Sequence, residues 1–335
     1  MGRYVIRRLL QAVLTIFLAL FLLHYLTSLS IQINGNPAYA FFGGQITPTQ
    51  EQLRVVAERY HTDHPCLKRV GDPCLSNFMD TLGRYANGDF GQDLRFRPVS
   101  DQVVMRVPNT LRVFAINIAT WAIAGIGLGM LAAVRREKFS DYLIRAGTII
   151  SGAVPTFLFV LALKYLAGVW IGGWLRDHLG DDNVLSIIFR PSWDEAHPWL
   201  TVILPGIALA VIGTAGITRL MRTSMLENIR SDHVRTAKAK GLTGGRVLLA
   251  HTLRNSLIPV VTLIGLSLGG ALGGAVITEG LWNIRGVGQF VFNAVRQNDT
   301  PIVVGVVSLV VICYLLFSLL IDLLYAVLDP RIRYE

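Results

Sequence analysis

The chain has 335 residues, of which 52% are hydrophobic and only 16% are charged. Soluble domains carry about 25% charged residues, so this composition indicates a membrane protein and counts against a soluble enzyme. The net charge is +9, but no basic patch is interleaved with aromatic residues in the way a nucleic-acid-binding groove requires, so no nucleic-acid partner is expected.

The N-terminus begins with a basic segment that contains Arg3, Arg7 and Arg8, and an apolar run follows from Leu9 to about residue 31. This run is long enough to cross a hydrocarbon core of about 30 Å. A cleaved signal peptide is the alternative, because Ala38-Tyr39-Ala40 resembles a cleavage site. The apolar run is, however, longer than a signal-peptide core and ends well before that site. We therefore expect residues 1–31 to form a tail and a retained first span.

A polar stretch, residues 32–107, separates the first two spans and is expected to form an extracytoplasmic loop or subdomain. Apolar residues recur at helical spacing over 48–60, which predicts a surface helix. A metal site is conceivable further on, but the spacing matches no zinc pattern, so none is predicted; its candidate ligands are His61, His64, Cys66 and Cys74. A disulfide between Cys66 and Cys74 is the alternative if the loop faces an oxidising compartment.

Five further apolar segments follow, which makes six expected transmembrane helices and an all-α polytopic fold. They cover about 111–134, 142–171, 200–217, 257–278 and 301–328. Pro155 is expected to kink the third span, because proline lacks an N–H and disrupts the helix before it.

Lys and Arg are distributed unevenly among the loops. Three precede the first span, three lie in 135–138, eight lie between 219 and 254, and two follow the sixth span, whereas loops 174–197 and 279–300 hold two each. Loop 32–107 holds eight, but loops longer than about 60 residues largely escape the positive-inside rule. The distribution predicts that both termini and the 219–254 segment face the cytoplasm.

The basic segment between the fourth and fifth spans, residues 231–256, is predicted to fold as a bent elbow of two short helices. Asp232 can cap the first helix and Gly241 can terminate it, while Thr243 can cap the second. A solvated cytoplasmic loop of positive charge is the simpler interpretation, and charge alone favours it.

The amino-acid sequence of this elbow resembles that of one branch of a transporter family. It reads V-R-T-A-K-A-K-G-L from Val234 and L-R-N-S-L-I-P-V from Leu253, and G-D-F-G at 88–91 and P-N-T-L at 108–111 precede the second span. These stretches are similar to the B-type permease subunits of dipeptide, oligopeptide and nickel ABC importers. The general E-A-A pattern of such importers is only partly kept, since Arg235 stands in place of its Glu and Arg254 in place of its Pro.

The resemblance implies a type I importer permease in a bacterial cytoplasmic membrane. Residues 108–335 would form its core, and both termini would lie on the cytoplasmic side. Its partners would be a second homologous permease, two ATPase subunits that bind ATP and Mg, an extracytoplasmic substrate-binding protein and a peptide. The chain itself would need no cofactor or metal and would not be an enzyme. The elbow would couple it to the ATPases through Asp232, Arg235, Thr236, Ala237, Lys238, Ala239, Lys240, Gly241 and Leu242.

Several chemistries have no motif in the sequence. It contains no G-x-x-x-x-G-K-[ST] phosphate loop, no H-E-x-x-H and no G-x-S-x-G. Away from the ends of the expected spans, the clear ionisable residues are Lys164, Asp322 and His24, whereas a proton-coupled carrier normally keeps a relay of such groups. A secondary transporter and a membrane-embedded peptidase therefore remain alternatives, and nickel or another small solute remains an alternative to peptide.

The fifth span is exceptionally rich in glycine and continues directly from the elbow. Small residues at these spacings permit either close helix packing or a helix that lines a pathway, and the sequence does not separate the two. The expected path would lie near the kink of the third span and near Pro205 of the fourth. Its candidate residues are Pro155, Gly265, Gly269, Gly270 and Gly273.

Overall fold

The computed structural model describes residues 2–33, 48–60, 64–93, 97–297 and 299–328. Within these ranges the chain is helical, and the β pairing found there is one isolated bridge between Gln92 and Pro98. The A-Y-A stretch at 38–40, His61 and the tail from 329 lie outside the described residues.

Six helical segments of the described chain are long and apolar enough to cross a membrane, which confirms the predicted number of spans. They cover Val5–Ile33, Val99–Val134, Thr156–Leu179, Pro198–Ile229, Gly244–Trp282 and Ile302–Leu319. The structure divides into two compact units, the first made of 1–107 and 290–335 and the second of 108–289.

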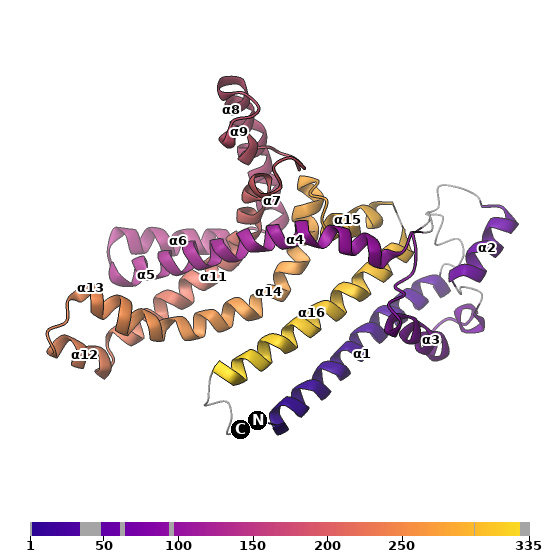
Figure 1. Ribbon diagram of the computed structural model, residues 1–335, viewed down its shortest axis with the longest axis horizontal. Coiled ribbons are helices and arrows are strands. Elements are labelled where there is room, and N and C mark those ends of the chain that lie inside the picture. The colour runs from indigo at the N-terminus through magenta and orange to yellow at the C-terminus, as the bar shows by residue number, and fades with distance from the viewer. Residues whose placement is uncertain (1, 34–47, 61–63, 94–96, 298, 329–335) are drawn as a thin grey trace. The chain divides into compact units, whose positions relative to one another are not determined.

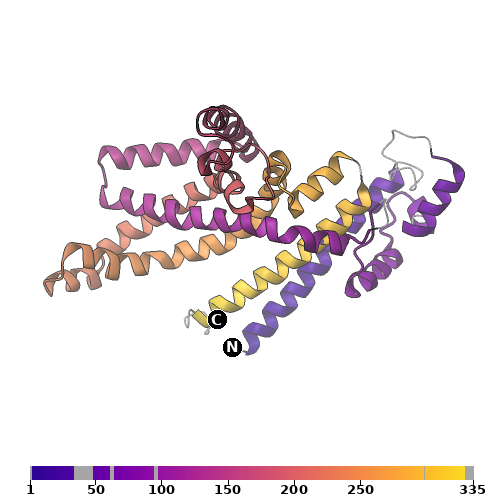
Figure 2. The same ribbon diagram turned by 45° about the horizontal axis from the view of Figure 1, so that its top comes forward.

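The first unit is built on α1 (Gly2–Ile33) and α16 (Thr300–Leu328), which pack along each other (Figures 1 and 2). The sixth span therefore groups with the first, whereas the sequence division had placed it in the 108–335 core. The unit also contains α2 (Gln50–Tyr60), α3 (Leu75–Ala86), the start of α4 (Val99–Thr120) and most of α15 (Val287–Arg296). Phe78 of α3 is buried between the rings of Phe17 and Phe21, which holds α3 against α1.

The end of α1 is tied to the segment that contains the two paired cysteines. Cys66 and Cys74 form a disulfide; Cys66 lies in the 3₁₀ turn η2 (Pro65–Lys68), and Cys74 directly precedes α3. The Gln32 amide donates to the Asp72 carbonyl oxygen over 2.8 Å, and its oxygen accepts from the Gly71 N–H over 2.8 Å. A disulfide and a buried amide thus fix the 66–74 turn to the first span.

We expect denatured, unreduced protein to show one reactive thiol, Cys313, and reduced protein to show three. Denaturation is needed because Cys66 and Cys74 are buried, so that poor labelling of folded protein would not distinguish a disulfide from inaccessible thiols. Replacing both cysteines by serine should lower the free energy of unfolding by about 2–3 kcal/mol, since the bond closes a short loop. Three reactive thiols in unreduced, denatured protein would contradict the pairing.

The second unit is arranged around α11 (Ile203–Ile229), which packs against α5 (Ile126–Val134), α6 (Phe139–Ala153), α7 (Thr156–Leu163) and α14 (Arg254–Trp282) (Figure 1). Glycine permits the closest of these contacts: a Cβ at Gly129 would lie 2.6 Å from the Met221 side chain. α5 follows the rest of α4 and the π turn η3 (Trp121–Gly125), and the Trp121 indole donates to the Ala210 carbonyl over 2.9 Å.

The third span is broken more sharply than a kink. α6 ends at Ala153, Val154 is extended, and α7 begins after Pro155. The residue before a proline is driven out of the helical region, so the break follows from the sequence. Beyond it, α7 continues through the π turn η4 (Lys164–Ile171) into α8 (Gly172–Leu179), and α9 (Val184–Ile188) and α10 (Pro198–Thr201) lead back to α11.

The expected bounds of two other spans were too short. α11 was expected to end near residue 217 but continues to Ile229, so that Arg219 and Arg222 lie within it. α14 was expected to end near 278 but continues to Trp282 and includes Glu279. A helix does not have to end where an apolar run ends, and each of these ionisable groups has polar partners, described below.

Candidate functional site

The elbow contains one short helix, α12 (Asp232–Ala239), held by a narrow apolar face. Val234 and Ala237 are buried against Val247, with Leu242 packed beside them. The rest of the predicted coupling segment is exposed, namely Asp232, Arg235, Thr236, Lys238, Ala239 and Lys240. α12 therefore presents a positively charged outer face while its inner face is fixed to the chain.

The ends of α12 agree in part with the prediction. Gly241 follows the helix with φ +76°, the left-handed conformation that favours glycine. The predicted N-cap was wrong by one residue: Ser231 is the extended residue before the helix, and Asp232 is its first helical residue. The Ser231 hydroxyl donates to the Asn228 carbonyl oxygen over 2.6 Å, so it closes the end of α11 and makes no cap bond.

The second predicted helix of the elbow is not a separate element. It begins after Thr243 as α13 (Gly244–Arg246), but it continues through the π turn η5 (Val247–Leu253) into α14 (Figure 1). His233 links the two parts, because its Nε2 lies 3.0 Å from the Asn255 amide nitrogen and 3.3 Å from the His251 carbonyl oxygen. α12 thus rests directly on the segment that continues into α14.

A buried ion pair lies in the neighbouring helices. Asp141 of α6 is 1% exposed and accepts two hydrogen bonds from the Arg222 guanidinium of α11, over 2.7 and 2.8 Å. These bonds, helped by the Glu137 N–H, hold the pKa of the Asp141 carboxyl below its usual value against the opposing effect of burial. The carboxylate therefore stays ionised, and a two-point contact of this kind fixes orientation as well as charge.

The glycines of the fifth span do not share one environment. A Cβ at Gly270 or Gly273 would meet nothing within 4 Å, whereas one at Gly274 would lie 2.8 Å from Leu209 of α11. Gly265 and Gly269 are half-buried in the same helix. α14 packs against α7, which begins after Pro155, and against α11, which contains Pro205. Only part of the glycine stripe is therefore used for packing within this chain.

At the other end of α14, Glu279 is fully buried and bound by backbone. Its Oε2 accepts from the N–H groups of Gly288 and Gln289 over 2.8 and 3.2 Å, at the start of α15. The Thr110 hydroxyl oxygen accepts from the Val287 N–H over 2.9 Å. A Cβ at Gly286 would collide with the carboxylate. Glu279 thus caps α15 from within the preceding helix.

We expect Glu279→Leu to lower the free energy of unfolding by about 3 kcal/mol, because the buried N–H of Gly288 and the partly buried N–H of Gln289 lose their acceptor. Glu279→Gln keeps an oxygen in place and should lose less than half as much. Thermal unfolding of the purified protein in detergent measures both variants. Equal stability of the Leu and Gln variants would show that the carboxylate position does not hold the loop.

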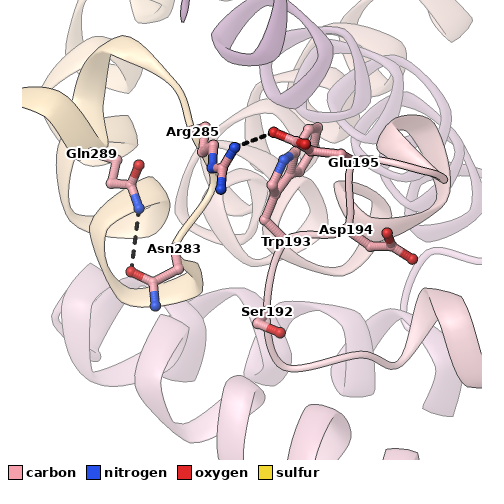
Figure 3. Close-up of a pocket in the computed structure, with 7 residues that line it drawn as sticks. All are labelled: Ser192, Trp193, Asp194, Glu195, Asn283, Arg285 and Gln289. Carbon is pink, nitrogen blue, oxygen red and sulfur yellow. Dashed lines mark hydrogen bonds and ion pairs between the residues drawn. The ribbon is translucent and has the colours of Figure 1, made fainter.

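A polar pocket opens beside this cap, between the loop that precedes α10 and the loop that follows α14 (Figure 3). Its volume is about 540 Å³, and it is lined by Ser192, Trp193, Asp194, Glu195, Asn283, Arg285 and Gln289. Arg285 and Glu195 form an exposed ion pair across the opening, while the Gln289 amide donates to Asn283 over 3.2 Å. The backbone N–H of Trp193 also donates to the Trp282 carbonyl oxygen over 3.2 Å.

Lys164 supplies another link at this end. Its ammonium group donates to the Leu281 carbonyl oxygen over 2.5 Å, near the end of α14. The sequence shows Lys164 only as an ionisable residue within the expected third span. In the structure it ties the third span to the fifth.

The main contacts that sequence reasoning missed are Asp141 with Arg222 and Glu279 with the start of α15. A single acidic residue after a basic turn, followed by an arginine in an otherwise apolar helix, was the available signal for the first. For the second, the signal was an acidic residue at the end of an apolar span. Neither signal identifies the partner, since Asp141 and Arg222 are 81 residues apart.

The family model described as binding-protein-dependent transport system inner membrane component matches residues 125–334, which include the elbow and the last two spans. The chain belongs to this family. It is an ABC importer permease of the type I fold, a transporter subunit and not an enzyme, and a multi-pass protein of the bacterial inner membrane.

Relatives of this permease align over nearly its whole length. It is 32% identical to the dipeptide transport system permease protein DppB of Escherichia coli K12, over 100% of both chains. It is 32% identical to the dipeptide transport system permease protein DppB of Alkalihalophilus pseudofirmus, over 90% of this chain and 91% of the relative. It is 31% identical to the oligopeptide transport system permease protein AppB of Bacillus subtilis, over 100% of both.

Proposed function

We propose that this permease is one half of the membrane channel of an ATP-driven importer of dipeptides or oligopeptides. The relatives named above are dipeptide and oligopeptide permeases, which supports peptide as the substrate class over nickel. A second homologous permease, two ATPase subunits that bind ATP and Mg, and an external substrate-binding protein complete the proposed assembly. Both termini and the elbow lie in the cytoplasm.

The observation that carries this proposal is how α12 is presented. Two buried residues hold the helix to the base of α14, and its outer face offers basic and small side chains without a partner subunit in place. A solvated loop has no need of such a fixed helix. We infer that α12 docks into a groove of an ATPase subunit, so that closure of the ATPases displaces α11 and α14 as rigid bodies.

Reconstitution tests the function directly. The permease is co-purified with its subunits, identified by mass spectrometry, and placed in vesicles with the loaded binding protein outside. We expect radiolabelled peptide to accumulate only with ATP and Mg inside, and to do so equally with or without an ionophore. Uptake that collapses with the ionophore and ignores ATP would indicate an ion-coupled carrier instead. Hydrolysis of the peptide by the permease alone would indicate a peptidase.

Orientation has its own test. Cys313 is first replaced by serine, and one exposed residue of α12, Lys238, is changed to cysteine. A membrane-impermeant maleimide applied to intact spheroplasts should leave Lys238→Cys unlabelled, while inside-out vesicles should label it fully. Labelling in spheroplasts would place the elbow outside and exclude the ATPase-docking role.

A further inference from the structure

The Asp141–Arg222 pair joins three parts of the chain. The carboxylate accepts from Arg222 Nε and Nη2, and its Oδ2 also accepts from the Glu137 N–H over 3.0 Å. Glu137 lies in the turn between α5 and α6 and has φ +63°, a left-handed conformation that non-glycine residues rarely adopt. One buried carboxylate therefore holds the turn in its conformation and fastens α6 to α11.

A second arginine of α11 holds α6 two turns further along. Arg219 Nη1 donates to the Thr148 carbonyl oxygen over 3.2 Å. Arg219 and Arg222 are three residues apart and so lie on the same face of α11. The Thr218 hydroxyl donates to the carbonyl oxygen of Gly125, the last residue of η3 before α5, over 3.3 Å. α11 is thus connected by polar bonds, as well as by apolar packing, to α6 and to the residue that precedes α5.

α11, which is bound to α6 in this way, connects to α12 without a flexible linker. Two residues, Arg230 and Ser231, separate α11 from α12, and their N–H groups donate to the Glu227 and Asn228 carbonyl oxygens. The Ser231 hydroxyl also donates to Asn228, as described above. A displacement of α12 should therefore move α11 directly, and with it the helix α6 that is bound to α11.

We propose that Asp141 and Arg222 are a positioning pair for transport: they make the 135–138 turn and α6 move together with α11 when the elbow is displaced. This inference rests on the proposed function, in which ATPase subunits act on α12. α6 ends at the Val154–Pro155 break, and α7 beyond it packs on α14. Movement delivered to α6 through the pair would thus reach the third span at its break, next to the glycine-rich helix.

Removing only one partner would leave a buried unpaired charge and could prevent folding. The test variant is therefore the apolar pair Asp141→Val with Arg222→Met, which stays close to the combined side-chain volume but deletes the bonds. The control is Val99→Ala, which shortens a fully buried side chain at the start of α4, in the other unit, and removes no polar side-chain contact. Arg222→Lys is the conservative variant, because it keeps the charge but loses the two-point geometry.

The readouts are the melting temperature of the assembled complex, the ATP hydrolysed per peptide imported, and hydrogen exchange of the 135–138 amides. We expect the apolar pair to assemble and hydrolyse ATP, with ATP used per peptide raised on the order of tenfold and faster exchange in the turn. Val99→Ala should lower the melting temperature with an unchanged ratio, and Arg222→Lys should lie between wild type and the apolar pair. Exchange that stays at the wild-type rate, or an equally raised ratio in Val99→Ala, would overturn the proposal.

The two proposals fail in different ways. If wild-type complex shows no ATP-dependent peptide uptake, the proposed function is wrong whatever the variants do. If wild type imports peptide and the apolar pair does so with the same ATP consumption, the function stands and Asp141 and Arg222 only stabilise the fold.

Discussion

Gly241→Val should nearly abolish peptide uptake while the permease still folds and inserts. Gly241 has φ +76°, and a β-branched residue in that conformation costs about 1–3 kcal/mol. A cost of this size reduces the population of the native turn by about 5- to 150-fold. The turn sets where α12 ends and how Leu242 reaches Val234 and Ala237, so its loss should displace the docking face. Uptake and ATPase activity of the reconstituted complex are measured together.

The chain offers matched controls for this variant. Gly245 lies nearby in α13, where a Cβ meets nothing within 4 Å, so Gly245→Val should be tolerated. Gly241→Asn should restore part of the activity, because asparagine enters the left-handed region more readily than valine. Normal coupling in Gly241→Val would show that α12 is a charged loop element without a docking role.

The sequence allowed the spans and the elbow to be located because their signals are local. Each span is a run of apolar residues as long as the bilayer is thick, and Gly241 stands where a short basic helix must end. The pairing of Cys66 with Cys74 was also within reach, since eight residues separate them. Such features need no knowledge of which distant residues meet.

Contacts between residues far apart in the sequence could not be predicted from it. The helix ends near such contacts also differ from the predicted ones. Hydropathy treats Arg219, Arg222 and Glu279 as the ends of spans, because a charge in a membrane is costly. In the folded chain the helices continue past these residues, with Arg222 paired to Asp141 and Glu279 bound by two N–H groups of α15. The partners come from other helices, and a single sequence gives no information about which helices are neighbours.

The glycine stripe of the fifth span shows the same limit at finer scale. The spacing predicts that small residues matter but leaves packing and pathway equally favoured. The structure separates adjacent glycines: Gly274 is used against Leu209, whereas Gly273 faces open space within this chain. The two positions can therefore be tested against each other in one helix.

Gly273→Leu should block peptide passage without disturbing the fold of the chain. The added side chain meets nothing within 4 Å of its Cβ, so the melting temperature should change little. Gly274→Leu should instead lower stability by about 1–3 kcal/mol, because its Cβ would lie 2.8 Å from Leu209 and overpack the contact with α11. Thermal unfolding of the two variants checks this contrast before any transport is measured.

The transport measurement then decides what Gly273 faces in the assembly. If it lines the path, Gly273→Leu assembles with its partner subunits and hydrolyses ATP, but imports peptide at about a tenth of the wild-type rate or less, the loss that about 1.4 kcal/mol of added barrier would give. Gly147→Leu, at another open glycine in α6, should import normally. Loss of the second permease from the purified complex would show that Gly273 packs between subunits. Normal import would show that Gly273 does not line the path, because a leucine there would narrow a channel for peptides.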